Sequence, residues 1–559
     1  MKQFGEQASV SSPTTTRTEH VTYAEHVLAR GALRITAIAA TAALAACTDE
    51  ELPPPNDERA ARFLGQAAFG GDQASIDAVK NQGYQGWLDA QMALPLGASL
   101  WDWLITKGFG DIQYKSTDQG MDNALWMRLF TSPDVVRQRV VLALSQLFVV
   151  SVRNMPVPWG QFGCVAYWEL LEAECFGNFR TLLEKITLSP SMGVYLNMRG
   201  NRKEDTSGRV PDENYARELL QLFSIGLLDL SIDGRPQLGA NGQTFESYDN
   251  TTVTGLAKVL TGWDFNGYNA STPDHMRRPM VFTAARHSTL EKKFLGVTVA
   301  GNTPGPQALK TALDTIFNHP NVGPFIGRQL IQRLVTSNPS DEYVARVATA
   351  FNDNGQGVRG DMKALISAVL MDMEARTELF SNGIETFGKL REPVARLVQW
   401  ARLVKVSSTD GLWNGGDLSG SNRLGQSPLR SPSVFNFFRP GYVPPHTALA
   451  AQGLVAPEFQ ITDESSVIGY ANFLLGVLPA GSANIVPDYT AWLPLAKDPA
   501  ALVARLNLWM TGSTVSAATV SSLVTALTTI RADNDGGLRK RVVTAMLMML
   551  CCPEYLAQR

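Results

Sequence analysis

The sequence predicts an all-α protein: a large multi-helix, bundle-like domain with long irregular loops and few short strands. Apolar residues recur at helical spacing along most of the 559-residue chain. Alternation typical of strands is confined to two short pieces, 280–283 and 294–299. Glycine is the usual residue just past a helix end, and glycines stand where the periodic stretches stop, at Gly226, Gly262, Gly355 and Gly512.

The first element of the chain predicts export. An apolar run, 32–46, closes on Leu44-Ala45-Ala46-Cys47. This run is shorter than the ~20 residues that span a membrane, and it has the length and the small residues of a signal core. We therefore expect a lipoprotein-type signal segment at 1–46, a lipid on Cys47 and an acidic, proline-rich tether at 47–56.

Two details of this segment bear on its start and its destination. Residues 1–29 are polar and long for the beginning of a signal. Either this beginning is unusually long, or translation starts later, at Val27 or Leu28. Thr48 rather than Asp follows Cys47, which by the sorting rule of enteric-type lipoproteins favours the outer membrane. The predicted location is the cell envelope, with the membrane as a partner through the lipid anchor.

Helical periodicity predicts the elements that follow. In the main helical domain, 57–405, helices are expected at 57–69, 72–82, 84–93, 119–131, 134–150, 164–175, 178–188, 212–228, 250–261, 306–318, 321–336, 339–353, 361–372 and 387–405. Asn338 is the expected N-cap of the helix that begins at Pro339. A Gly/Ser and aromatic-proline loop region, 406–463, comes next. A C-terminal helical part, 464–559, is expected to pack on the main domain, with helices at 464–478, 499–510, 515–531 and 537–552.

Composition excludes several classes of function. Hydrophobic residues make up 45% of the chain, charged residues 18%, and the net charge is −3. Because no block of Lys and Arg stands out, nucleic acid is not expected as a partner. Of five cysteines, four remain if Cys47 carries a lipid, and the sequence leaves their disulfide status open. No zinc-type spacing occurs, so no metal site is assigned, and the cofactor is unknown.

A polar stripe marks the segment 211–224. Asn214, Arg217, Glu218 and Gln221 follow helical spacing and share one face of an otherwise apolar helix. One interpretation is a polar site lined by these residues. The other is a solvated face with a Glu213–Arg217 pair four residues apart.

Trp263 opens a loop that contains His275 and His287. His287, if joined to Glu213 or Glu218, would form an acid/base or metal site. The alternative is a solvated loop histidine. The candidate catalytic residues are therefore Glu213, Arg217, Glu218 and His287, and the candidate binding residues include Asn214, Gln221 and Trp263.

Aromatic residues gather between prolines at 431–442. Phe435, Phe438 and Tyr442 are candidate binding residues for a chain-like ligand; the alternative is a loop that plugs the core with Phe435 and Phe438. The tripeptide Arg359-Gly360-Asp361 is discounted as an adhesion motif because Asp361 suits the N-cap of the next helix. No GxSxG, P-loop or dinucleotide-binding motif is present.

Together, several stretches resemble the bacterial family known as domain of unknown function 1800. The matching stretches cover nearly the whole mature chain: 60–70, 136–151, 176–196, 211–227, 260–265, 318–340, 357–372 and 431–442. The resemblance implies an exported protein without an established activity. It also implies a secreted, sulfatase-like partner protein, because a family resembling alkaline phosphatases and sulfatases is often encoded beside this one.

The chain departs from this family at two positions. Many relatives read Glu-Leu-His where this chain has Gln221-Leu222-Phe223, which weakens any metal or acid/base site on this helix. His287 matches a family histidine, but the Asp that often follows it is Ser288 here.

Two functions remain in view. The first is an envelope lipoprotein that binds or assembles a partner protein or an extracellular polymer. The alternative is an envelope hydrolase or other acid/base enzyme that uses a Glu/Arg/His site.

Overall fold

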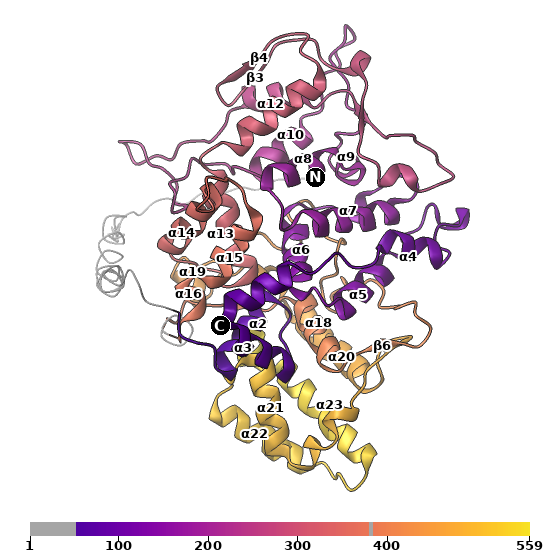
Figure 1. Cartoon of the computed structure of the whole chain (residues 1–559), viewed down its shortest axis with the longest axis vertical. Coiled ribbons are helices and arrows are strands. Elements are labelled where there is room, and N and C mark those ends of the chain that lie inside the picture. Colours follow the sequence, from indigo (N-terminus) through magenta and orange to yellow (C-terminus); the bar gives the residue numbers. More distant parts are fainter. Residues whose placement is uncertain (1–51, 379–383) are drawn as a thin grey trace, which may run out of the picture. The chain divides into compact units, whose positions relative to one another are not determined.

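The computed structural model describes residues 52–378 and 384–559, and residues 53–559 form one compact unit (Figure 1). The prediction of an all-α fold is confirmed, since 53% of the structure is helical and 5% lies in short strands. The predicted signal segment and the lipidated Cys47 lie outside the described residues.

The first half of the unit contains ten helices that frame its core. They are α2 (Asp57–Ala67), α3 (Gln73–Met92), α4 (Leu100–Thr106), α5 (Met121–Thr131), α6 (Val135–Leu147), α7 (Gly160–Glu174), α8 (Phe179–Leu188), α9 (Pro190–Tyr195), α10 (Asn214–Gln221) and α11 (Asn250–Val259). The predicted helices 72–82 and 84–93 run on as α3, with a kink at Gly83, whose φ is +71°. The helices α4 and α9 were not predicted, because so few turns carry little periodic signal.

The second half continues the helical pattern to the C-terminus. Its longer helices are α12 (Gly305–Phe317), α13 (Val322–Leu334), α14 (Asp341–Asn352), α15 (Met362–Met371), α18 (Pro393–Leu403), α20 (Glu464–Ala480), α21 (Pro499–Thr511), α22 (Ala517–Thr528) and α23 (Asp535–Cys551). Short helical turns include α16 (Met373–Arg376), α19 (Ala448–Ala451), α24 (Pro553–Leu556) and the 3-10 turn η5 (Pro457–Ile461).

The strands are short antiparallel pairs. β1 (Trp263–Asp264) pairs with β2 (Val281–Phe282), and β3 (Lys292–Phe294) with β4 (Val297–Val299). β5 (Lys389–Leu390) pairs with β8 (Ala557–Gln558), and β6 (Ser407–Ser408) with β7 (Ile485–Val486). β2 and β4 fall in the two predicted pieces, and β3 ends where the second of them begins. The β5–β8 pair returns the end of the chain to its middle.

Two predicted helix boundaries are wrong. The helix 212–228 ends at Gln221, because Ile225 and Gly226 both donate backbone hydrogen bonds to Leu220 and turn the chain. The helix 387–405 starts at Pro393, because Lys389 and Leu390 form β5.

The N-cap predicted at Asn338 is also wrong. Ser340 caps α14 by accepting a hydrogen bond from the Tyr343 backbone N–H, while the Asn338 side chain bonds the backbone of Val455. By contrast, Asp361 caps α15 as predicted.

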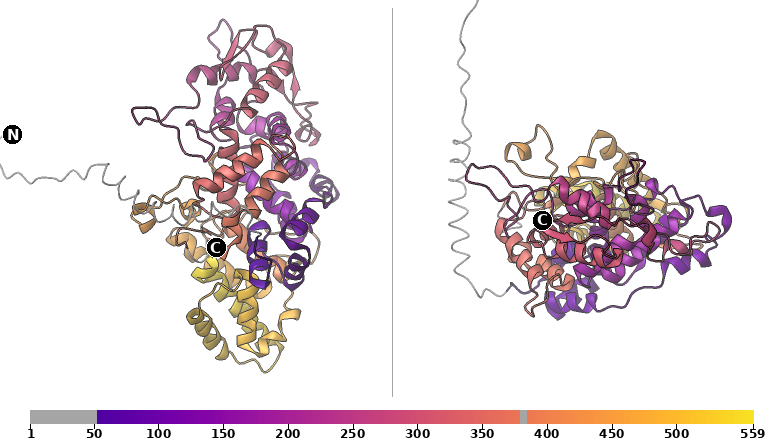
Figure 2. Two further views of the ribbon diagram at one scale, coloured as in Figure 1. Left: turned by 60° about the vertical axis from the view of Figure 1, so that its left-hand side comes forward. Right: turned by 90° about the horizontal axis from the view of Figure 1, so that it is seen from above.

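The core centres on α6, nearly all of which is buried. Residues 135–154 are the one described stretch with the length and composition to cross a membrane, and 89% of it is buried inside the protein. Such burial is typical of a core helix. The C-terminal helices (yellow in Figures 1 and 2) join this core where α21 packs against α2.

Candidate functional site

The polar stripe on α10 divides between surface and interior. Arg217 donates to the Glu213 carboxylate over 3.1 Å, and both side chains are partly exposed. Thr254 of α11 donates to the other Glu213 oxygen over 2.9 Å. Asn214 and Gln221 are half-buried. This part of the stripe has the geometry of a surface ion pair.

Glu218 lies on the buried side of α10. Burial raises the pKa of its carboxyl, and Arg217 offsets only part of that rise. One carboxyl oxygen, Oε2, is buried without a hydrogen-bond partner among the described residues. Glu218 therefore takes up a proton more readily than an ordinary glutamate.

His287 is buried, with 4% of its surface exposed. Its Nδ1 lies 2.9 Å from the carbonyl oxygen of Thr261 and 3.1 Å from the Thr261 hydroxyl. A carbonyl can only accept, so Nδ1 carries the proton and Nε2 presents a lone pair. Burial lowers the pKa of His287, which keeps the ring neutral. Nε2 has no partner within the described ranges.

Four residues surround His287, and two of them, Glu204 and Lys292, were not singled out by the sequence. The Ser288 hydroxyl donates to Glu204 over 3.0 Å, and the Ser288 backbone N–H donates to the Thr261 hydroxyl over 2.9 Å. Lys292 is fully buried and donates to the carbonyls of Ser288 and Leu290. Thr261, His287, Ser288, Glu204 and Lys292 are called the His287 cluster below.

Trp263 extends this cluster as an aromatic wall. It is buried, and its ring contacts that of Phe282 at 5.5 Å; Phe282 in turn contacts the His287 ring at 5.3 Å. Behind the wall, Arg286 donates to Asp264 over 2.6 Å. Sequence reasoning found Trp263 and His287 from their types, but Glu204 stands over 80 positions from Ser288 without a local motif.

The structure does not join the predicted catalytic residues into one network. In the described part of the chain, no hydrogen bond or ion pair links His287 to Glu213, Arg217 or Glu218. A neutral histidine beside a carboxylate can accept a proton in acid/base chemistry. Here that histidine is buried away from solvent. It belongs to a different group of polar residues from the exposed Glu213–Arg217 pair.

The aromatic residues of the aromatic-proline loop also divide between the interior and the surface. Phe438 is buried and Tyr442 half-buried, whereas Phe435 is exposed with the Arg439 guanidinium over its ring at 4.8 Å. Phe438 is therefore buried, although outside the main hydrophobic core cluster, and Phe435 faces solvent.

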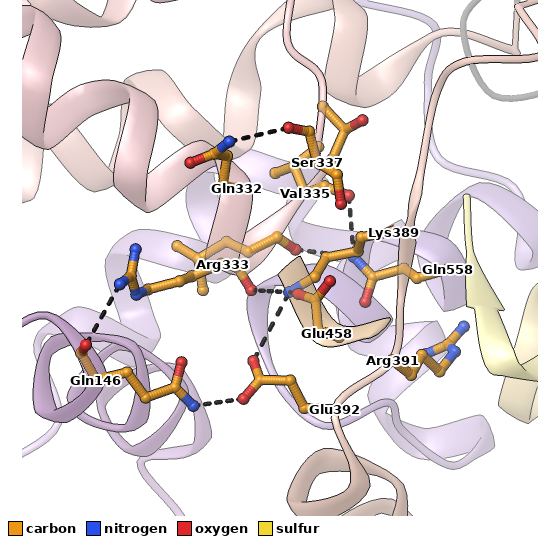
Figure 3. Close-up of polar contacts among 12 residues, drawn as sticks. Gln146, Gln332, Arg333, Val335, Ser337, Lys389, Arg391, Glu392, Glu458 and Gln558 are labelled. Atoms are coloured by element: carbon orange, nitrogen blue, oxygen red, sulfur yellow. Dashed lines mark hydrogen bonds and ion pairs between the residues drawn. The ribbon is translucent and has the colours of Figure 1, made fainter. Parts of the chain in front are cut away.

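A second polar cluster, which the sequence did not indicate, lies in the core (Figure 3). Lys389 donates to the carbonyl oxygen of Arg333 over 2.8 Å and to the Glu458 carboxylate over 2.9 Å, and its Nζ lies 3.7 Å from Glu392. Gln146 and Gln426 donate to Glu392 from two further segments. We call Arg139, Gln146, Arg333, Lys389, Glu392 and Glu458 the Lys389 cluster.

Burial and the neighbouring charges together set the pKa values of the Lys389 cluster. Burial lowers the pKa of Arg333 to about 10, still far above neutrality. Burial would raise the pKa of Glu392, but Lys389 and Arg139 outweigh it, and the net shift is downward. Burial raises the pKa of Glu458 despite Lys389. The adjoining cavities measure only about 10 Å³ each, which is room for about one water and not for a ligand. The Lys389 cluster therefore has a structural role: it links segments of the core.

A wider hollow of about 780 Å³ lies near the start of α2. Side chains of both charges line it, and none of the predicted site residues is among them. The lining residues are Asn56, Glu58, Arg59, Arg62, Glu378, Gly512, Ser513, Thr514, Pro553, Glu554, Ala557 and Arg559. Its volume suits a small ligand, but its charges do not single out one chemistry.

An extended arm, residues 227–247, projects from the helices (Figure 2). Its two sides are paired by backbone hydrogen bonds, such as Asp229 N–H to Phe245 oxygen over 2.9 Å. Nearly every residue from 235 to 246 is exposed, and no charged residue occurs from 236 to 245. Leu238 is 63% exposed and Phe245 50%. The arm therefore offers an uncharged, partly apolar tip to solvent.

Asn321, at the start of α13, holds the base of this arm. Its buried amide donates to the carbonyl oxygens of Ile225 and Leu228 and accepts from the Leu230 backbone N–H, all within 2.9 Å. The Asn321 side chain therefore ties the base of the arm to the start of α13 and to Ile225, which just precedes the arm.

Within the part of the chain that the structure describes, neither a metal site nor a disulfide contributes to these clusters. Among the described residues, no group of three His, Cys, Asp or Glu side chains is placed to hold a metal ion. Cys164, Cys175, Cys551 and Cys552 are free thiols, and all but Cys551 are buried. Burial raises the pKa of the Cys164 thiol to about 12, so this cysteine is inert.

Fold and sites define a class: a mostly helical protein built as one compact unit around a core helix, with closed polar clusters and a projecting arm. The chain belongs to the family described as protein of unknown function (DUF1800), whose model matches residues 62–557. No curated protein and no solved structure matches it.

Proposed function

We propose that this protein is a lipid-anchored protein of the cell envelope that binds a partner protein through the arm. The sequence supports the anchor through Cys47 and its apolar leader, with the outer membrane as the destination. The family resemblance supports a secreted, sulfatase-like protein as the partner.

One observation carries the binding role: the arm is held in place but not covered. Leu238 and Phe245 keep half or more of their surface in water, although burying such a side chain is worth ~1.5–3 kcal/mol. The buried Asn321 amide is devoted to the base of the same arm. An ordered, uncharged, apolar tip suits insertion into an apolar site on another protein.

The partner-binding role is tested with a double variant, Leu238→Ser with Phe245→Ser. The matched control is Ile105→Ser with Ile112→Ser, two similarly exposed apolar residues outside the arm. The tagged sulfatase-like product of the neighbouring gene serves as bait on envelope extracts. We expect the arm variant to bind it at least tenfold more weakly, about 1.4 kcal/mol, and the control to bind as wild type does. Equal recovery of all three proteins would overturn the role of the arm.

The anchor is tested separately by Cys47→Ala. This variant is expected to leave the membrane fraction while its body stays folded. A variant that still sediments with membranes would contradict both the anchor and the location.

A second candidate, an acid/base enzyme of the envelope, rests on the His287 cluster. Its observation is a neutral histidine with an unpaired Nε2 beside Glu204, one of whose carboxyl oxygens is also buried without a partner among the described residues. A hydrolase screen of wild type against His287→Asn tests it. Turnover that His287→Asn abolishes without unfolding would establish the enzyme, and no turnover would exclude it for the substrates used.

A further inference from the structure

The helix α20 carries no charged side chain after its first residue, Glu464. From Ser465 to Pro487 the chain has no Asp, Glu, Lys, Arg or His. Helices that are apolar on all sides are typically buried on all sides. The sequence of α20 therefore predicts complete coverage.

One side of α20 is covered within the molecule. Tyr470, Leu474 and Leu478 are buried, and the Tyr470 hydroxyl donates to the Leu550 carbonyl of α23 over 3.2 Å. Gly469 packs against the backbone of Ser421 in the preceding loop region, since an added Cβ would come within 2.0 Å of the Ser421 carbonyl oxygen. This side holds α20 firmly beside α23 (Figure 1).

The opposite side of α20 is open. Val467 is 56% exposed, Ile468 62% and Leu475 56%. Their spacing places them on one face over about two turns. The α20 face consists of these residues with Ala471, Asn472, Gly476 and Pro479, all partly or fully exposed. Single exposed apolar residues are ordinary, but a continuous uncharged stripe marks a contact surface.

We propose that the α20 face packs against the same face of a second copy of this chain, across a two-fold axis. In such an interface each surface meets its own copy, so the surface must be self-complementary. The α20 face can meet its own copy without repulsion between like charges, because it contains no charged side chain. With the helices antiparallel, Ile468 lies near Leu475 of the second copy, and apolar meets apolar at both ends.

Asn472 distinguishes a second copy from a lipid surface. It is the one polar side chain of the α20 face and lies near its middle, and no described residue hydrogen-bonds it. On a two-fold axis its amide can donate to and accept from the Asn472 amide of the second copy. In lipid the amide would be left unpaired, at a cost of ~1–3 kcal/mol.

Gly476 gives the second helix room to approach. A Cβ added there would meet nothing within 4 Å, so the surface beside Asn472 is recessed. One helix face is smaller than the ~800 Å² that each partner buries in a standard interface. We therefore expect a weak dimer. The dimer does not depend on the proposed arm contact or on the lipid anchor, although an anchor would raise the local concentration.

The experiment uses full-length protein in membranes with Asn472→Cys and a mild oxidant. Cysteines that face each other across the axis lie within disulfide reach when the helices pack closely. The native thiols Cys164, Cys175 and Cys552 are buried, and the half-exposed Cys551 is replaced by Ser in every variant. We expect a covalent dimer of Asn472→Cys on a non-reducing gel, and none of the control Gln85→Cys, which is exposed on α3. Adding Leu475→Asp to Asn472→Cys should reduce the dimer at least tenfold.

Three outcomes overturn the proposal. They are a monomeric Asn472→Cys, an equal dimer yield from Gln85→Cys, and cross-linking of Asn472→Cys to a different protein. Sedimentation of the purified wild type supplies a second measurement, since its average mass should rise with concentration and that of Leu475→Asp should not. Loss of this dimer would leave the pull-down with the arm variants unchanged, so the two proposals fail separately.

Discussion

At the scale of single residues, the environment rather than the residue type decides the chemistry. Glu213 and Glu218 lie five positions apart on and beside one short helix, yet Glu213 forms an exposed pair with Arg217 and Glu218 is buried with a raised pKa. His287 is buried too, and a backbone carbonyl fixes which of its nitrogens holds the proton. The four catalytic residues remain a prediction: Glu213 pairs with Arg217, but no hydrogen bond or ion pair among the described residues joins His287 to them.

His287 should make the stability of the protein depend on pH. Burial lowers its pKa in the folded state, so the unfolded chain binds more protons as pH falls below the ordinary histidine pKa of ~6.5. Protonation therefore favours unfolding, and stability is lost with falling pH. Between pH 7.5 and pH 5.5 the denaturant midpoint of wild type should fall more steeply than that of His287→Asn.

The variant is chosen to preserve the contact. The Asn amide still donates to the Thr261 carbonyl but does not titrate, so we expect it to cost only about 1 kcal/mol at pH 7.5. His446→Asn, at an exposed position, should retain the slope of wild type. Parallel pH profiles for wild type and His287→Asn would contradict this account.

At the scale of elements, the local sequence pattern predicted which helices exist better than it predicted where they begin and end. The helices from α11 to α15 and the Asp361 cap lie close to their predicted positions, because periodicity and capping are local properties. The ends of α10 and the start of α18 were missed. Both are decided by distant partners: α10 stops where Gly226 turns against Phe325, and α18 starts after β5 pairs with β8.

The arm gives the prediction at this scale. Asn321→Ala removes three hydrogen bonds and leaves the groups of Ile225, Leu228 and Leu230 unpaired. We expect the free energy of unfolding to fall by ~2–3 kcal/mol and proteases to cut the arm faster. Denaturant titration and limited proteolysis measure the two effects.

A nearby asparagine supplies the control for that experiment. Asn318 hydrogen-bonds only within its own helix end, at an exposed position, so Asn318→Ala should change stability by less than ~0.5 kcal/mol. If Asn321→Ala were equally mild and the arm stayed protected, Asn321 would not be its anchor.

At the scale of the whole molecule, the Lys389 cluster ties distant parts of the chain into one unit. It joins α6, α13, the segment from β5 into α18, and η5, while Gln558 of β8 donates to the carbonyl of Leu334 beside it. Buried ions are costly unless paired, so each member depends on the others. The cluster therefore couples the central helices to the C-terminus.

Lys389→Met should show this dependence. It leaves Glu392 and Glu458 without their shared cation in the interior, and we expect a loss of ~3–5 kcal/mol in the free energy of unfolding. Adding Glu458→Gln should restore part of the loss by removing one uncompensated charge. The exposed Lys310→Met should cost less than ~1 kcal/mol. Single and double variants of equal stability would exclude the coupling.

The sequence by itself determined the helical class, the family and the cap at Asp361, and it offered the pairing of Glu213 with Arg217 as one of two interpretations. Each of these follows from residues a few positions apart, where helix geometry sets the contact. Only the tertiary structure decided that His287 lies beside Glu204, that Lys389 meets Glu458, that the arm is held by Asn321 and that α20 keeps an open face. Those contacts join segments tens to hundreds of residues apart, and the local sequence does not show which distant segments will meet.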